Sequence, residues 1–97
     1  MYNGWKNYET WNVALWIDND QGTYEMAREW ARDAIRADHE HAPGSVADSL
    51  RDFVNEFTPD LPASMYADLL GAAISEVNWY EIAEHWVEEA VEEAEAA

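Results

Sequence analysis

The residues of this chain that could do chemistry are concentrated at its end, where "NWYEIAEHWVEEAVEEAEAA" (residues 78–97) contains seven glutamates and no lysine or arginine. At about 100° per residue, five of the seven share a helical arc of about 80°, and Glu89 extends that face. The five are Glu81, Glu84, Glu88, Glu92 and Glu95. Seven charges over about 21 Å give roughly one per 3 Å, within a factor of two of the spacing in duplex DNA, about one per 1.7 Å. The pattern predicts a rigid negative stripe that can imitate a phosphate backbone.

The stripe belongs to a strongly acidic chain, with 21 Asp and Glu against five Lys and Arg and a formal net charge of −16. All five bases lie in residues 1–51, so residues 52–97 carry twelve acids and no base. Such a surface repels nucleic acid and anionic membranes, which excludes direct binding to DNA or RNA and favours basic partners. Two alternatives remain open: the glutamates form an ordinary solvated face, or they reflect adaptation to high salt. Salt adaptation would spread acids over every surface, so the uneven distribution favours a directed face.

Other chemical constellations are weak. His39 and His41 in "DHEH" could ligate a metal, but a third ligand such as His85 would have to come from elsewhere in the fold, and a polar helix end is the simpler interpretation. The sequence contains no phosphate-cradling glycine loop and no HExxH or GxSxG motif, and no carboxylate pair is singled out as a general acid. We therefore expect no enzyme activity, no cofactor and no metal site.

A repeat of 3.6 residues dominates the apolar pattern and predicts an all-α fold, a compact single domain over residues 1–97 with about five helices and an acidic outer face on the last. Asn7 is expected to cap the first helix, "DNDQG" to end it, and the second to start around residues 21–23. In that second helix, Glu25 with Arg28, Glu29 with Arg32, and Asp33 with Arg36 are expected to pair at i,i+3.

The second half of the chain is punctuated by two predicted breaks. "DHEHAPGS" is expected to be a loop whose Ser45 caps the third helix, and "TPDLP" to separate the third helix from the fourth. Asn78 and Glu81 form a capping-box-like start for the fifth helix. The inward rows of the third and fourth helices are expected to include Phe53, Phe57, Tyr66, Leu69, Leu70 and Ile74.

The six tryptophans could suggest a base-stacking platform, but such platforms need interleaved Lys or Arg, and the neighbours here are acidic. Trp11, Trp30, Trp79 and Trp86 lie on apolar rows, so core packing is the favoured role. Tyr2 and Trp5 precede the first helix and are expected to staple the N-terminus onto the core.

Two stretches carry a family resemblance: "NYETWNVALWIDNDQGTYE" (residues 7–25) and "SMYADLLGAAISEVNWYEIAEHW" (residues 64–86). They resemble a family of short proteins of phages, mobile elements and some prokaryotic genomes. The resemblance implies a phage or mobile-element setting and carries over no site residue. In charge and style the chain also resembles the acidic antirestriction protein Ocr and the acidic anti-CRISPR proteins, which mimic DNA.

These observations lead to one functional expectation: a phage-type anti-defence inhibitor that acts as a DNA mimic and blocks the DNA or PAM site of a host CRISPR effector or restriction enzyme. The expected partner is therefore the Lys/Arg-rich surface of a nucleic-acid-binding host protein, with no membrane and a possible homodimer. The candidate contacts are Glu81, Glu84, Glu88, Glu89 and Glu92, with Asp60, Asp68 and Glu76 as extensions.

The alternative is a non-enzymatic interaction module that uses an apolar patch around Trp5, Trp16 or Tyr80, with the acidity serving only solubility or salt adaptation. The absence of cysteines, of a cationic and apolar leader and of a long apolar run fits a cytoplasmic protein of the host cell.

Overall fold

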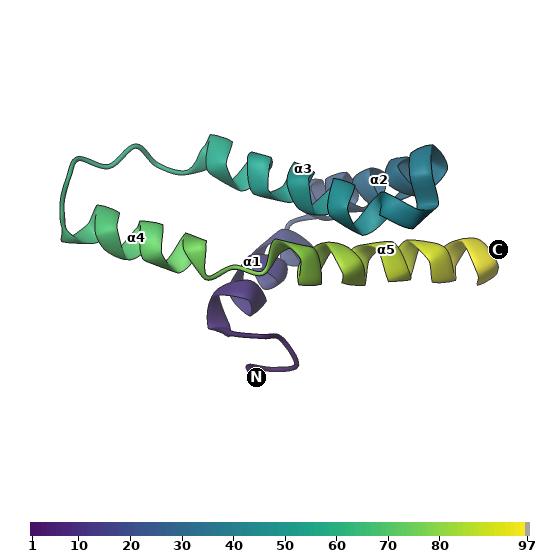
Figure 1. Cartoon of the computed structure of the whole chain (residues 1–97), viewed down its shortest axis with the longest axis horizontal. Coiled ribbons are helices and arrows are strands. Elements are labelled where there is room, and N and C mark those ends of the chain that lie inside the picture. Colours follow the sequence, from purple (N-terminus) through teal and green to yellow (C-terminus); the bar gives the residue numbers. More distant parts are fainter. Residues whose placement is uncertain (97) are drawn as a thin grey trace.

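The computed structural model describes residues 1–96; Ala97, the last residue of the expected domain, lies outside the described residues. Within that range the chain is helical, as predicted, and the one β-type contact is an isolated bridge between Tyr2 and Trp5. The elements are α1 (Tyr8–Asn19), α2 (Gln21–Asp38), the 3-10 turn η1 (His39–His41), α3 (Ala42–Phe57), α4 (Met65–Ser75) and α5 (Trp79–Ala96). Figure 1 shows α3 and α5 running antiparallel along the long axis, with α4 preceding α5 along the same edge.

Local capping fixes where most of these helices begin. The side chain of Asn7 accepts a hydrogen bond from the Thr10 N–H at 2.9 Å, as predicted, which satisfies one of the free donors of the first turn of α1. Asp20 ends α1 and also caps α2 through the Thr23 N–H at 3.0 Å, so a single residue separates the two helices. Ser64 caps α4 in the same manner.

The predicted loop "DHEHAPGS" is wrong. Residues 39–41 form η1, and α3 begins at Ala42 with Pro43 in its first turn, so Ser45 lies inside the helix and does not cap it. Proline is favourable in this position because its fixed φ suits the helix and its missing N–H would have no partner there. Pro43 is therefore a helix start rather than a break.

The core is built largely from small side chains. Ala27, Ala31 and Ala83 are at most 1% exposed, and they let α2, α3 and α5 approach closely around Leu50 and Ile82, which are fully buried. Within residues 1–96, Trp86 is the one buried tryptophan, at 4% exposed; Trp5, Trp30 and Trp79 are half-buried and pack against the same core. The predicted core role is thus confirmed for Trp30, Trp79 and Trp86, whereas the half-buried Trp11 packs on Tyr2 and Tyr8 instead, and Trp16 is 71% exposed.

The helix α4 does not join this core. None of its residues is buried, and Tyr66 and Leu69, predicted to face inward, are 69% and 61% exposed, as is Phe57 near the end of α3 at 68%. The α3–α4 connection and α4 form an arm at the end of the molecule opposite the C-terminus (Figure 1). The packed body therefore has four helices, α1, α2, α3 and α5, rather than the five expected, and the molecule measures 49 × 27 × 25 Å.

The first residues fold back onto α1 and α5. Tyr2 and Trp5 exchange two backbone hydrogen bonds of 2.7 and 2.8 Å around Asn3 and Gly4, whose positive φ angles of 48° and 88° suit an Asn-Gly turn. The Trp5 ring lies 4.3 Å from the His85 ring of α5, and Tyr2 packs on Trp11 at 5.1 Å. The predicted staple is therefore present.

Across residues 1–96, no helix combines the length and apolar character needed to cross a membrane.

Candidate acidic face and apolar groove

A buried hydroxyl joins the two stretches that carried the family resemblance. Thr10 of α1 is fully buried; its hydroxyl donates to Asn7 Oδ1 at 2.6 Å and accepts from the Asn78 N–H at 2.9 Å. Asn7 also donates through Nδ2 to the Glu76 carbonyl oxygen at 2.7 Å. The start of α1 is thus bonded to the α4–α5 junction. These bonds give Asn7, Thr10 and Asn78, polar residues of the two motifs, a structural role.

Glu81 belongs to this junction. Its backbone N–H donates to Asn78 Oδ1 at 3.1 Å, which confirms Asn78 as a cap, while its carboxylate accepts from the Lys6 backbone N–H at 3.1 Å. The residue is half-buried. Glu81 therefore ties the N-terminal segment to α5, and it is less free than the other candidate glutamates.

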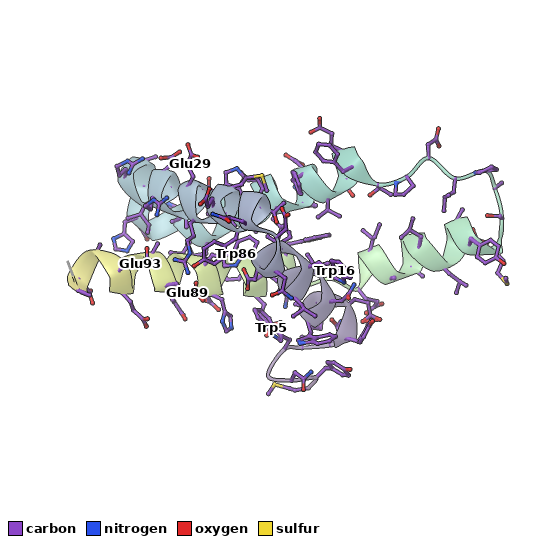
Figure 2. The ribbon with its side chains drawn as sticks, turned by 180° about the vertical axis from the view of Figure 1, so that it is seen from behind. Trp5, Trp16, Glu29, Trp86, Glu89 and Glu93 are labelled. Carbon is purple, nitrogen blue, oxygen red and sulfur yellow. The ribbon has the colours of Figure 1, made fainter. Side chains whose placement is uncertain are left out.

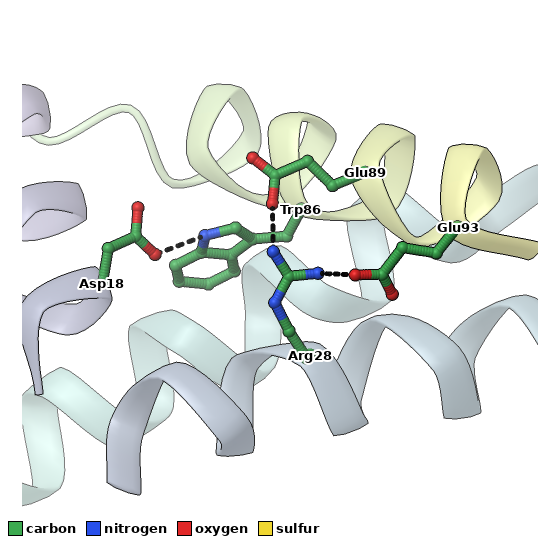
Figure 3. A network of polar contacts seen from close by, with 5 residues as sticks. All are labelled: Asp18, Arg28, Trp86, Glu89 and Glu93. Atoms are coloured by element: carbon green, nitrogen blue, oxygen red, sulfur yellow. Dashed lines mark hydrogen bonds and ion pairs between the residues drawn. The ribbon is translucent and has the colours of Figure 1, made fainter. Parts of the chain in front are cut away.

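Arg28 of α2 clamps the side of α5 (Figure 3). Its guanidinium bonds Glu93 Oε1 at 2.5 Å and Glu89 Oε2 at 3.0 Å, and it lies 4.5 Å from the centre of the Tyr24 ring. Burial opposes the Arg28 charge, but the contacts with Tyr24, Glu93 and Glu89 outweigh it and raise the pKa of Arg28. The predicted pairing of Arg28 with Glu25 is therefore wrong, because Arg28 forms its ion pairs with Glu89 and Glu93 of α5.

Among the other expected pairs on α2, Asp33 with Arg36 forms as predicted, whereas no ion pair between Glu29 and Arg32 is present in the described chain. Glu29 is exposed on the outer surface of α2 (Figure 2).

The remaining glutamates of α5 stand apart from this clamp. Glu84, Glu88, Glu92 and Glu95 are all exposed, on the side of α5 away from Ile82, Trp86 and Ala90. Within residues 1–96 no ion pair involves any of the four, whereas Glu89 and Glu93 lie on the edge that faces α2 (Figure 2). No base occupies the last turn of α5, so the negative end of the helix dipole adds to this field.

The three proposed extensions are not brought together with this column. Asp60 lies in the α3–α4 connection and Asp68 in the first turn of α4, both on the arm. Glu76 caps the end of α4, nearer to α5. Of the eight candidate residues, Glu84, Glu88 and Glu92 thus form one solvent-facing group, and Glu89 is already paired.

Asp18 is a polar residue that the sequence did not single out. Its Oδ1 accepts a hydrogen bond from Nε1 of the buried Trp86 at 3.3 Å (Figure 3). Burial raises the pKa of the Asp18 carboxyl, although this hydrogen bond and the charges of Arg28 and His85 act in the opposite direction. Asp18 and Trp86 are 68 residues apart in the sequence, so no local sequence pattern indicates this hydrogen bond.

The histidines do not converge. His41 Nδ1 lies 2.7 Å from Asp38 Oδ2, and this hydrogen bond lowers the pKa of the Asp38 carboxyl, while His85 packs on Trp5. In the part of the chain that is described, no group of three or more His, Cys, Asp or Glu residues could hold a metal ion.

An apolar groove with a volume of about 420 Å³ lies between α1, the end of α3 and α4. Its apolar lining includes Val13, Trp16, Phe57, Leu70, Ala73 and Ile74. Glu9 is the one charged residue that lines it within residues 1–96. From the sequence, Trp16 was placed in a possible apolar patch, but Phe57, Leu70 and Ile74 were predicted to face the core. Periodicity identifies an apolar row, but it cannot show that no other element covers that row.

Comparison with known proteins places the chain in a family without assigning it an activity. Neither the curated proteins nor the solved structures give a match. One family model, described as a family of unknown function (DUF7249), matches residues 1–96, and the chain belongs to that family.

Proposed function

We propose that this chain is a binding protein of a phage or mobile element, and that the column Glu84, Glu88, Glu92 and Glu95 docks on the Lys/Arg-lined nucleic-acid site of a host defence enzyme. In this role it is an inhibitor that takes the place of DNA, and it needs no cofactor. The observation that carries the proposal is that these four carboxylates are exposed in one column and form no ion pair within residues 1–96, while Arg28 serves only Glu89 and Glu93.

The energetics of α5 support an external partner. Glu84, Glu88 and Glu92 follow one another at i,i+4, where like charges destabilise a helix by a few tenths of a kcal/mol per pair. Glu92 and Glu95 also lie near the negative end of the helix dipole. A basic surface would relieve both costs, and arginines there would form charge-assisted, often bidentate bonds with each carboxylate, as they do with phosphate.

Capture from a host lysate tests the proposal. Immobilised protein should retain a basic nucleic-acid-binding protein at low salt and release it along a salt gradient, because contacts between exposed charges are screened. The variant E84Q/E88Q/E92Q should lose this protein. The matched control E25Q/E29Q/E40Q removes the same charge from exposed positions on α2 and η1 and should retain it. Equal capture by the two variants would show that the column is not the binding surface.

One observation favours a second candidate, an interaction module without DNA mimicry. The groove between α1, α3 and α4 exposes aromatic and aliphatic side chains, and one of its walls, α4, contributes no buried residue to the core. Exposed apolar surface of this kind is typical of protein-binding sites. In that case substitutions at Trp16 or Phe57, and not in the α5 column, would abolish capture.

A further inference from the structure

We propose that the groove between α1, α3 and α4 binds an amphipathic helix whose apolar row is flanked by lysine or arginine. The groove lies on a different part of the molecule from the α5 column, so the inference does not depend on DNA mimicry; it rests on the second candidate function above and names the chemistry of its partner. Its volume of about 420 Å³ falls within the usual range of binding pockets, roughly 300–1,000 Å³, and its floor is apolar.

The shape of the groove fits a helix better than an extended strand. Its walls are helices, α1 and the end of α3 on the body and α4 on the arm, and in the described chain no sheet edge is available for strand addition. Trp16 and Phe57, 71% and 68% exposed, lie at its margin, while Leu70 and Ile74 form one row of α4. Apolar side chains of a guest helix at i, i+3, i+4 and i+7 would fill such a groove.

The acidic residues in and near the groove favour basic residues beside the apolar row of the bound helix. Glu9 lines the groove, and acids adjoin its lining residues in the chain: Asp52 and Glu56 on α3, and Asp60 beyond Pro59. None of the five bases of the chain lines it within residues 1–96. Basic flanks would therefore be attracted and acidic ones repelled.

The same charges argue against a second copy of this chain as the occupant. Each copy carries a net charge of −16, and α1, α4 and α5 contain no lysine or arginine. The helix with the most bases, α2, buries its apolar row in the core through Ala27, Ala31 and Ala34. No helix of the described chain thus offers both a free apolar row and basic flanks.

Fluorescence anisotropy with two labelled 18-residue peptides tests the inference. Both carry the same leucine row at helical spacing, one with lysine flanks and one with glutamate flanks. We expect the lysine peptide to bind at least about tenfold more tightly and to shift the summed tryptophan emission of the protein, because it covers the exposed indole of Trp16. Equal binding of the two peptides, or binding of neither, would overturn the proposal.

Two adjacent leucines of α4 give the matched controls. Leu70 lines the groove and Leu69 does not, so L70S should weaken binding of the lysine peptide about tenfold while L69S leaves it unchanged. F57S is a second groove variant, at an exposed position on α3 where substitution does not disturb the core or the arm. It should weaken binding of the lysine peptide as L70S does. The variant E84Q/E88Q/E92Q should bind the peptide as the wild type does; a loss there instead of in L70S would place the peptide on the α5 column and refute the groove.

The oligomeric state distinguishes the remaining occupants. Light scattering should give a monomer mass over a wide concentration range, and native mass spectrometry should show no retained lipid. A concentration-dependent dimer that L70S abolishes, or a lipid that the lysine peptide fails to displace, would contradict the proposal.

Discussion

Replacing Arg28 by methionine should destabilise the fold far more than the same change at another arginine of α2. Arg28 joins α2 to α5 through Glu89 and Glu93 and packs on Tyr24. Because both carboxylates are about half-exposed, at 48% and 52%, each ion pair contributes only about 0.2–1 kcal/mol. The cation–π contact adds about 0.5–1 kcal/mol, and the unmasked repulsion between Glu89 and Glu93 at i,i+4 a few tenths.

The sum is a loss of about 2 kcal/mol, or roughly 8–16 °C in Tm for a domain of this size. Urea and thermal unfolding followed by circular dichroism would measure it. R32M is the matched control: Arg32 is exposed on the same helix and forms no ion pair within residues 1–96, so its loss should cost less than about 0.5 kcal/mol. In an E89Q/E93Q background, R28M should cost about 1 kcal/mol less than in the wild type. Equal destabilisation by R28M and R32M would refute the clamp as a stabilising contact.

Two further predictions concern polar groups that join separate helices: the buried Thr10 and the partly buried carboxyl of Asp18. T10V removes the hydroxyl that bonds Asn7 and the Asn78 N–H, so both partners lose a hydrogen bond. The free energy of unfolding in urea should fall by about 1–3 kcal/mol. T58V is the control, because the Thr58 hydroxyl makes one local bond; a smaller loss in T10V than in T58V would show that the contact between α1 and the start of α5 does not depend on the Thr10 hydroxyl. For Asp18, a folded-state pKa above the usual value means that its stabilising contribution is complete below about pH 4 and is lost as pH rises through the folded pKa. D18N should therefore have a higher Tm than the wild type at pH 7, with the difference closing towards pH 4; a constant difference across that range would contradict the raised pKa.

The parts of the fold that depend on neighbouring residues could be predicted from the sequence. Asn7 and Asn78 were identified as caps because a capping side chain and the backbone N–H that donates to it lie three residues apart, and the helical periodicity identified Trp86 and Ile82 as inward. The start of α3 was misassigned because Pro43 suits both a loop and a first helical turn, and only the packing of Ala42 against the core selects the latter.

The features that were predicted wrongly or not at all depend on contacts between helices that are distant in the sequence. The apolar row of α4 was predicted to be buried, but periodicity does not say whether another helix covers it; here none of its residues is buried, and Leu70, Ala73 and Ile74 are half-buried beside the groove. Arg28 has a local acid at i−3, yet it pairs with Glu89 and Glu93, more than 60 residues away. For the same reason, the sequence counted Glu81 and Glu89 with the free glutamates, although the fold engages both.

If the α5 column takes the place of DNA, the protein should inhibit DNA cleavage in competition with the DNA substrate. The assay measures cleavage by the captured defence enzyme at increasing DNA concentration, with wild-type protein and with E84Q/E88Q/E92Q. We predict inhibition that DNA relieves by competition, and an inhibition constant about 100-fold weaker in the triple variant, from about 1 kcal/mol per lost charge-assisted contact. Inhibition that persists undiminished in that variant, or that excess DNA does not relieve, would contradict the account.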